Sequence, residues 1–469
     1  MIKRLIKFSA SYTAIEGLQR GALFLMLPIF THYMTPEEYG IVSTALILIS
    51  FLSVLFSFAI HASISRYYHK YENTNELKEF LGSNFIFLSL ISLVISIIMI
   101  LFSKAFFDNF FAEIAFYPYI VYTLIIVSSQ VIIVSYFSLL KAMQKIKLYS
   151  IVFNSYFIFQ LILMSVLIIN YDFKQDGYLL GVMVSNIIFV PIVFILLKKE
   201  IVYKINIKYI KESLEYSLPI IPVELIGNIN RLIDRYYILI FIGLNGVGIY
   251  YVGVQIAGLI NLIALAINSA YAPIFFKKYE NNIDDNYDDI YKLSDIIVFT
   301  VGVVASILII LSPLFLNLFS KDYQDSGDVI LYLGFTGAIT SIYFINTNVL
   351  SLDPKLIKLK TIGIIFGTII NVILGYYFTK YYGIKGASIS TLIGFSFTSL
   401  ILLYIVKRKT EFKFNNLIYL AYMCLLFFCL YITIDFSILI RLLVICIVLF
   451  IIIFINFNQR LFNNIIKGL

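Results

Sequence analysis

The sequence is poor in charge: Asp, Glu, Lys and Arg make up 13% of its 469 residues, against roughly 25% in soluble proteins. Hydrophobic residues make up 61%, and the mean hydropathy is +0.94. This combination excludes a soluble globular protein, a disordered chain and a nucleic-acid-binding protein. The net charge of +8 is instead attributed to the Lys and Arg excess typical of cytoplasmic loops in membrane proteins.

Other absences exclude whole classes of chemistry. The three histidines have no acidic or cysteine neighbours at ligand spacing, so no metal site is expected. The three cysteines lie inside apolar segments near the C-terminus and predict neither a disulfide framework nor a metal cluster. The sequence has no G-x-x-x-x-G-K-[ST] phosphate loop, and no pattern typical of a hydrolase or acyltransferase. We therefore expect neither an enzyme nor a cofactor.

Long apolar runs dominate the chain. They last about 20 residues without strict alternation, which predicts transmembrane helices and not barrel strands. The sequence predicts an all-α polytopic membrane protein with about 14 transmembrane helices. The predicted spans are 9–32, 39–61, 80–103, 118–140, 148–170, 177–197, 213–243, 247–271, 293–317, 329–351, 361–379, 385–406, 415–434 and 438–457.

Positive residues alternate between the two predicted sides of the membrane. With the N-terminus placed in the cytoplasm, 26 of the 35 lysines and arginines fall in cytoplasmic segments, six in outer loops and three inside spans. Cytoplasmic loops of membrane proteins carry such an excess. We therefore predict a multi-pass membrane protein with both termini cytoplasmic.

Two weak internal matches are separated by nearly the same number of positions in the sequence. The segment around Gly40 resembles that around Gly248, and QKIKLYS at 144–150 resembles PKLIKLKT at 354–361. Transporters are often built from repeated halves, although chance similarity among Ile- and Leu-rich helices is the alternative. The matches predict a six-helix lobe at 1–200, a second at 201–410 and two additional helices at 411–469.

Six ionisable residues lie inside two of the predicted spans, where charge is expensive and usually faces a bundle interior or a wet cavity. These are Glu16 and Arg20 in the first span, and Glu224, Arg231, Asp234 and Arg235 in the seventh. Helical spacing places each group on one flank of its helix. Intrahelical ion pairs that only hold packed helices together are the alternative. Helix bends are predicted at Pro28, Pro219 and Pro222.

Amide and hydroxyl side chains are scattered through several spans. Each alone is typical of interhelical hydrogen bonding, but together they could line a groove for sugar hydroxyls. The set comprises Asn154, Tyr156, Gln160, Asn186, Asn228, Asn230, Gln255, Asn261, Asn268, Tyr271 and Asn371.

Three segments resemble one family. LPIFTHYMTPEEYGIVSTA, from Leu27 to Ala45, resembles the P-x-x-T-x-x-L-[ST]-P-x-E-[YF]-G signature of Wzx-type polysaccharide-lipid flippases, with Met34 in place of the usual Leu. SLPIIPVELIGNINRLIDRYYILIFIGLNGVGIYYVG, from Ser217 to Gly253, and GIKGASIST at 383–391 resemble two further patterns of that family. The family belongs to the multidrug/oligosaccharidyl-lipid/polysaccharide exporter superfamily.

This resemblance implies two six-helix lobes around a central cavity, plus two C-terminal helices. It implies translocation of an undecaprenyl-diphosphate-linked oligosaccharide across the bacterial inner membrane, for O-antigen, capsule or another surface polysaccharide. Membrane lipids, a polysaccharide polymerase and a chain-length regulator are the other expected partners. We predict that Arg20, Arg231 and Arg235 bind the lipid diphosphate.

Ion coupling and the competing functions stay open at this point. Glu16, Glu224 and Asp234 could carry protons if burial raises a carboxyl pKa toward neutrality, or could only position the arginines. A multidrug cation exporter of the related antimicrobial-extrusion family is the first alternative, followed by a lipid II flippase and a membrane polysaccharide polymerase. A cation exporter should present an acidic or aromatic cavity, and a polymerase needs a longer external loop than this sequence offers.

Overall fold

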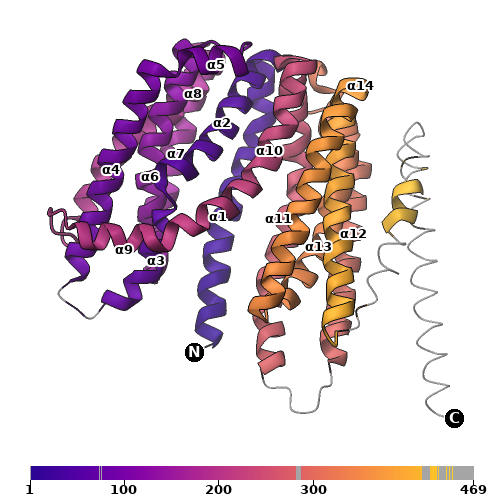
Figure 1. The fold of residues 1–469 in the computed structure, drawn as a ribbon. Helices are drawn as coiled ribbons and strands as arrows, with labels where there is room; N and C mark the ends of the chain where they lie inside the picture. The colour runs from indigo at the N-terminus through magenta and orange to yellow at the C-terminus, as the bar shows by residue number, and fades with distance from the viewer. Residues whose placement is uncertain are drawn as a thin grey trace. The chain divides into compact units, whose positions relative to one another are not determined.

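The computed structural model describes residues 2–72, 74, 76–280, 287–412, 414, 423–429, 431, 440, 443 and 446. Over these residues the chain is α-helical and contains no strand (Figure 1), which confirms the predicted fold class. The first part of the chain forms α1 (Ile2–Tyr33), α2 (Pro36–Ser57), α3 (Ile60–Tyr71), α4 (Leu77–Phe102), α5 (Lys104–Phe110), η1 (Phe116–Ile120), α6 (Val121–Ala142), α7 (Ile146–Ser165), η2 (Val166–Asn170) and α8 (Lys174–Leu197).

The second part of the chain begins with a short helix that the sequence did not predict. Its elements are α9 (Ile207–Ser217), η3 (Leu218–Ile220), α10 (Ile221–Phe241), α11 (Leu244–Glu280), α12 (Asp288–Leu316), η4 (Lys321–Tyr323), α13 (Ser326–Leu350) and α14 (Pro354–Lys409). The predicted spans at 361–379 and 385–406 both lie in α14, which is kinked at Gly383 with φ 63° and ψ −143°. Glycine adopts this conformation without the steric cost of a Cβ.

Nine of the helices in the described residues are long and apolar enough to cross a membrane. Twelve spans were predicted in this part of the chain. One of the nine helices, α14, contains two of these spans, and α1 and α10, which are not among the nine, correspond to two more. The protein is therefore a multi-pass membrane protein. The predicted spans 415–434 and 438–457 lie almost wholly outside the described residues.

The chain folds into two compact units. One comprises Met1–Val252, Phe319–Tyr323 and Gly375–Ala387, and the other comprises Gly253–Leu318, Gln324–Leu374 and Ser388–Leu469. The predicted lobes at 1–200 and 201–410 and the additional helices at 411–469 stay a prediction.

The TPEEYG segment forms a complete helix start. Thr35 Oγ1 accepts a hydrogen bond from the Glu38 amide at 3.3 Å, and Glu38 Oε2 accepts one from the Thr35 amide at 2.8 Å. This reciprocal capping box, with Pro36 in the first turn, satisfies amides that would otherwise lack partners. Glu38 Oε1 also pairs with Lys174 of α8 at 2.8 Å, so the start of α2 is held in the first unit.

The first turns of α2 and α11 pack with their backbones in contact. A Cβ on Gly40 would lie 2.0 Å from the carbonyl oxygen of Leu244. A Cβ on Gly248 would lie 1.9 Å from the carbonyl oxygen of Pro36. The two glycines paired by the sequence repeat therefore meet at one helix crossing, where no larger side chain fits.

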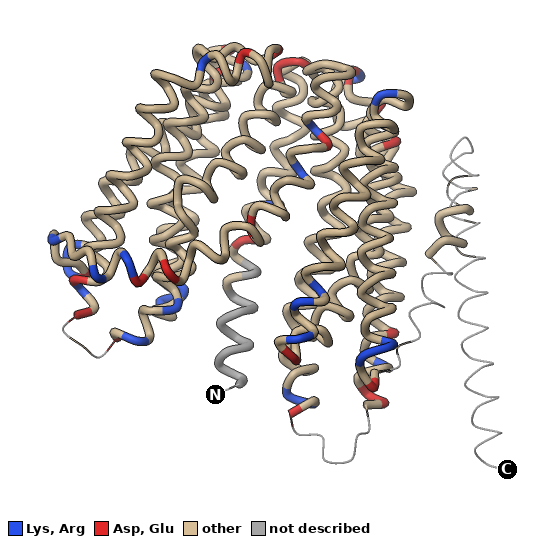
Figure 2. Tube along the Cα trace, in the orientation of Figure 1, with Lys and Arg blue, Asp and Glu red and all other residues tan. Residues whose placement is uncertain are grey.

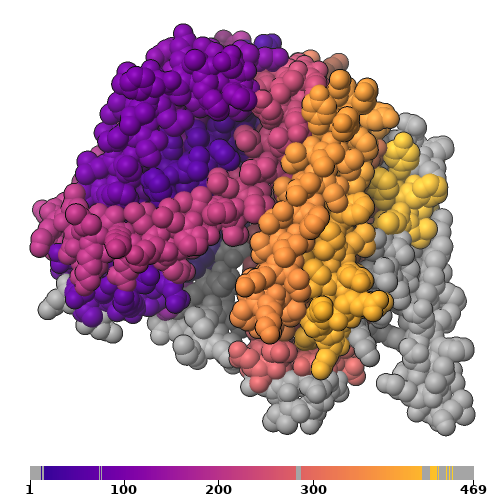
Figure 3. All heavy atoms as spheres, viewed as in Figure 1, coloured from indigo at the N-terminus to yellow at the C-terminus, as the bar shows by residue number. Residues whose placement is uncertain are grey.

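The helix α9 corrects the sequence prediction, which assigned residues 198–212 to a loop and began the seventh span at 213. It packs across the ends of α3 and α4 (Figure 1) and forms part of a band on the surface of the first unit (Figure 3). Glu212 accepts hydrogen bonds from Lys70 and, at 2.6 Å, from the Tyr71 hydroxyl. Tyr209 donates to Glu76 at 3.0 Å. The connection between α8 and α10 is therefore fastened to α3 and α4.

The ion pair between Glu212 of α9 and Lys70 of α3 is charged at neutral pH. Burial raises the pKa of Glu212, but the hydrogen bonds from Lys70 and Tyr71 outweigh it and hold that pKa below its usual value. The hydrogen bond to Glu212 raises the pKa of Lys70. Both groups stay charged at neutral pH, and the stability that Glu212 contributes is lost as the pH falls through its lowered pKa.

Candidate substrate-binding site

The helix α10 carries charged side chains along its length, whereas most charges in the described residues lie near helix ends (Figure 2). It follows the 3₁₀ turn η3, which contains Pro219, and Pro222 lies in its own first turn. Proline lacks the amide hydrogen that a continuous helix would need. The helix packs against α2, where Ser50 donates a hydrogen bond to Asn228 Oδ1 at 2.9 Å.

Arg235 is a buried cation that forms no ion pair among the described residues, although the charge of the neighbouring Asp234 acts on it. Its side chain is 8% exposed. Its Nη1 group donates to the Arg231 carbonyl at 3.2 Å, its guanidinium lies 5.7 Å from the centre of the Tyr251 ring, and its Nε has no partner in the described part of the chain. A cation–π contact offsets only part of the cost of burying a charge.

Arg20 and Arg231 add two exposed cations to this site. Arg20 of α1 lies close enough for its positive charge to act on the Arg231 guanidinium. Neither residue forms an ion pair within the described chain. The structure therefore brings together two of the three predicted arginines in space, and Arg235 follows Arg231 by one helical turn.

Glu16 turns away from this cluster. Its Oε1 lies 2.6 Å from Lys141 Nζ of α6 and accepts a hydrogen bond from the Tyr149 hydroxyl of α7 at 3.0 Å. The contacts of Glu16 thus join α1 to α6 and α7 and leave Arg20 uncompensated. The intrahelical Glu16–Arg20 ion pair, considered as an alternative from the sequence, is not formed between these two described residues.

The other two carboxylates also have partners outside the arginine cluster. Glu224 Oε1 lies 3.3 Å from His61 Nε2 of α3, with both side chains 28% exposed. Asp234 is 6% exposed and accepts a hydrogen bond from the Tyr250 hydroxyl at 3.3 Å. The contact with His61 was not predicted from the sequence, because 163 positions separate this residue from Glu224. This contact joins α10 to α3.

Pro28 lies inside α1. Its carbonyl accepts a hydrogen bond from Thr31 Oγ1 at 2.8 Å and lies 2.7 Å from His32 Nδ1. These side-chain contacts occupy the carbonyl oxygen of Pro28. The helix bends predicted at Pro28, Pro219 and Pro222 stay predictions.

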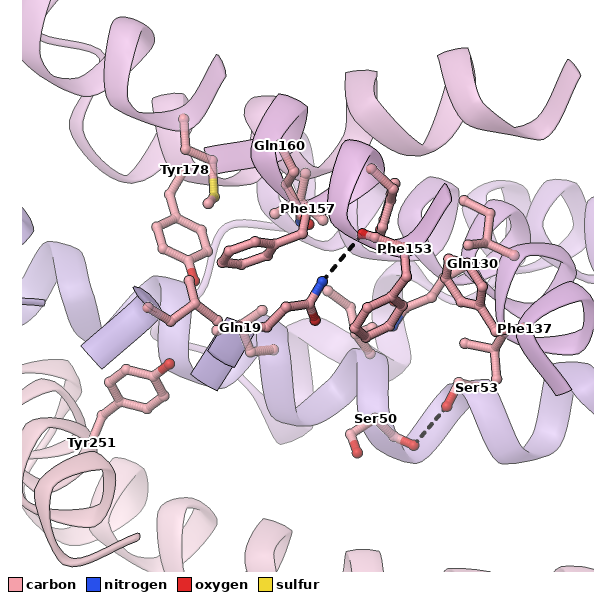
Figure 4. Close-up of a pocket in the computed structure, with 18 residues that line it drawn as sticks. Gln19, Ser50, Ser53, Gln130, Phe137, Phe153, Phe157, Gln160, Tyr178 and Tyr251 are labelled. Carbon is pink, nitrogen blue, oxygen red and sulfur yellow. Dashed lines mark hydrogen bonds between the residues drawn. The ribbon is translucent and has the colours of Figure 1, made fainter. Parts of the chain in front are cut away.

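A pocket of about 430 Å³ lies inside the first unit. It is lined from α1, α2, α6, α7, α8 and α11, and none of its 18 lining residues is charged. Figure 4 shows Tyr178 and Tyr251 toward one end, Gln130 and Phe137 toward the other, and Gln19 between them. The Gln19 amide donates to the Phe153 carbonyl at 3.3 Å. The pocket is polar but neutral.

The amide and hydroxyl residues that were predicted as a possible sugar groove lie in different places in the structure. Gln160 and Tyr156 line the pocket, and the Tyr156 hydroxyl donates to Asn186 at 2.6 Å. In the second unit such residues join helices instead: Asn261 accepts from Thr340 at 3.0 Å, and Asn268 accepts from Asn348 at 2.9 Å. Gln19 and Gln130, also on the pocket wall, were missed because single glutamines carry no pattern.

Comparison with known proteins gives a family and a fold. The model of the polysaccharide biosynthesis protein family matches residues 5–278. The structure is similar to a lipid II flippase MurJ in an inward closed conformation, with 18% identity, a TM-score of 0.64 and coverage of 94% of this chain and 100% of that one. It is also similar to an inward-facing multidrug resistance MATE family transporter of the MOP superfamily, with 16% identity, a TM-score of 0.63 and coverage of 83% and 97%. None of the curated proteins matches this sequence.

Proposed function

The chain belongs to the polysaccharide biosynthesis protein family, and on this premise we propose that it is a flippase for a lipid-linked oligosaccharide. The substrate is an undecaprenyl-diphosphate-linked repeat unit, which moves from the cytoplasmic to the outer leaflet of the bacterial inner membrane. The translocated unit serves O-antigen, capsule or other surface polysaccharide assembly. A polysaccharide polymerase and a chain-length regulator are the protein partners in this proposal.

The buried cation Arg235, beside Arg231 and Arg20, carries the proposal. A diphosphate cannot cross hydrocarbon without compensation, because desolvating an unpaired charge costs many kcal/mol. Guanidinium groups pair bidentately with phosphate oxygens and stay charged at any working pH. A site that holds three arginines without a paired carboxylate among the described residues therefore favours an anionic headgroup.

Alternating access around this cluster accounts for movement of the headgroup. Arg20 lies on the first predicted span, and Arg231 and Arg235 lie on the seventh. One helix from each of the predicted lobes, 1–200 and 201–410, then holds the diphosphate while these lobes rock about it. The prenyl tail stays in the lipid phase.

Proton coupling is the proposed energy source. Among the three predicted carboxylates, Glu16 contacts Lys141, and Asp234 is buried and accepts a hydrogen bond from the Tyr250 hydroxyl. We assign the proton-carrying role to Glu224, which contacts His61. Glu16 and Asp234 then act as positioning residues.

A multidrug cation exporter is the competing function, since MATE transporters share the fold. Such a protein needs a site that attracts cations, whereas the charged site here is cationic. A lipid II flippase has the same diphosphate chemistry, and MurJ shares the fold. The sugars attached to the diphosphate distinguish that alternative from the proposed substrate.

Reconstitution tests the function directly. In proteoliposomes, we expect the protein to translocate a prenyl-diphosphate-linked N-acetylglucosamine, scored by its exposure to an external glycosyltransferase. A pH gradient should raise the initial rate, and amide replacement of Glu16, Glu224 and Asp234 together should remove that response. Export of ethidium without lipid translocation would favour the cation exporter. A full gradient response in the triple amide variant would exclude these carboxylates as proton carriers.

The proposed topology has both termini in the cytoplasm. Reporter fusions after Lys199, in the turn following α8, and after Lys409, at the end of α14, should score cytoplasmic. Fusions near Asn245, at the start of α11, and near Asp325, before α13, should score periplasmic. Alkaline phosphatase and green fluorescent protein fusions measure this in pairs. Reversal at any one position would mean that the chain crosses the membrane a different number of times before that point.

A further inference from the structure

The neutral pocket of the first unit borders the arginine cluster. Tyr251 lines the pocket, and the same ring lies under the Arg235 guanidinium at 5.7 Å. One tyrosine therefore separates a buried cation from an uncharged cavity of about 430 Å³, a size within the range of small-molecule sites. A ligand with its anionic part at the arginines can extend its next group into this pocket.

Two amides on the pocket wall have no hydrogen-bond partner among the described residues. Gln130 of α6 and Gln160 of α7 are partly buried, and neither side chain forms a hydrogen bond with any described residue. Gln19, in contrast, is held by the Phe153 carbonyl. A glutamine amide offers two donors and one acceptor. Two free amides facing a partly enclosed cavity indicate a ligand with hydroxyl or amide groups of its own.

The remaining lining narrows the chemical class. Phe137, Phe153, Phe157 and Tyr156 supply aromatic rings, against which the C–H faces of a sugar ring can pack. An alkyl chain would leave the amides and the Ser50 and Ser53 hydroxyls facing hydrocarbon, at a cost for each unpaired group. A carboxylate would be buried here without a cation in the lining. An organic cation would be repelled by Arg235 at one end.

We propose that this pocket binds an uncharged sugar, the residue attached directly to the prenyl diphosphate. The amides of Gln130 and Gln160 hydrogen-bond its hydroxyl or N-acetyl groups while the diphosphate lies at the arginines. This inference rests on the proposed function and adds the class of the first sugar: a neutral hexose or N-acetylhexosamine, and not a uronic acid.

Binding of three lipids to the purified full-length protein in nanodiscs tests the inference. The probes are prenyl diphosphate alone, prenyl diphosphate carrying N-acetylglucosamine, and prenyl diphosphate carrying glucuronic acid, each measured by native mass spectrometry. The N-acetylglucosamine form should bind about tenfold or more tighter than the other two, the effect expected of two neutral hydrogen bonds. Equal affinity for all three lipids would overturn the sugar pocket.

Paired variants assign the preference to the two amides. The double variant Gln130→Leu, Gln160→Leu should lose the preference for the N-acetylglucosamine form and keep its affinity for bare prenyl diphosphate, which also shows that it is folded. Gln175→Leu, a glutamine of the same unit that lies outside the pocket lining and donates to Tyr119, should keep the preference. A preference that survives in the double variant would contradict the assignment. Failure of wild-type protein to bind any prenyl diphosphate would instead contradict the proposed function, and the pocket assignment with it.

Discussion

Replacing Arg20, Arg231 and Arg235 together by alanine should abolish translocation of the prenyl-diphosphate lipid while the protein stays folded in the membrane. Each charge-assisted hydrogen bond contributes about 1.5–3 kcal/mol, and 1.4 kcal/mol corresponds to a factor of ten. Loss of three such groups should therefore lower the rate by at least about 100-fold. The measurements are surface glycan in cells and lipid translocation in proteoliposomes.

Stability should survive this change for a specific reason. Removing one member of a buried ion pair leaves the other charge orphaned, but Arg235 forms no ion pair among the described residues. Its removal therefore breaks no ion pair, and the nearby buried Asp234, whose charge acts on Arg235, keeps its hydrogen bond from the Tyr250 hydroxyl. Arg66→Ala is the matched control, because this exposed arginine of α3 stacks at 5.6 Å on the Tyr216 ring, outside the cluster. It should leave translocation unchanged.

Two results would contradict diphosphate binding by these residues. One is normal translocation by a triple alanine variant present at wild-type abundance. The other is the pattern of a purely structural role, in which Arg→Lys variants work normally and Arg→Ala variants fail only because the protein disappears from the membrane. Lysine keeps the charge but not the bidentate geometry of the guanidinium, so translocation by the lysine variants should be impaired.

Gly40→Ala and Gly248→Ala should each destabilise the crossing of α2 and α11 by about 1–3 kcal/mol, the usual cost of overpacking. The added methyl group would meet a backbone carbonyl in both cases, at 2.0 Å from Leu244 and 1.9 Å from Pro36. A backbone atom cannot rotate away as a side chain can, so the helices must separate. Melting temperature, and hydrogen exchange at 36–40 and 244–248, report this separation.

A third glycine provides the control for helix propensity. Gly258 lies on α11, and a Cβ there would have no atom within 4 Å. Gly258→Ala should therefore be neutral or stabilise the helix by up to about 1 kcal/mol. The double variant at Gly40 and Gly248 should lose less stability than the sum of the two single variants, because one separation of the helices makes room for both methyl groups. Equal melting temperatures for all three single variants would show that the crossing tolerates a methyl group.

Hydropathy located the membrane spans well but not the short elements between them. The run at 213–243 reads as one span because apolar residues continue across Ser217 and Pro219. The structure ends α9 at Ser217 and begins α10 at Ile221. The residues of α9 alternate between charged and apolar at helical spacing, which suits an interface and not a membrane interior. A similar break after α2 comes from Phe58 and Ala59, whose positive φ values no propensity predicts.

The site was predictable only as far as local spacing reaches. Positions 231 and 235 lie one turn apart on any helix, so their shared flank followed from the sequence. The partners of the carboxylates did not: Lys141 lies 125 positions from Glu16, and such pairs form only when distant helices pack. The pocket depends on six helices, none of which shows in its own sequence that it faces a cavity.

The fastening of α9 to α3 and α4 restricts how α10 can move. A flexible connection would let α10 slide along its axis. Here Glu212 and Tyr209 anchor α9, so the turn at Leu218–Ile220 is the nearest point at which the chain can bend. Pro219 withholds an amide hydrogen at that turn, so fewer backbone hydrogen bonds resist rotation there. Any motion of α10 would then be a rotation about this turn. On such an arc Arg231, at the middle of the helix, and Arg235, beyond it, would travel farther than Glu224, which lies in the first turn.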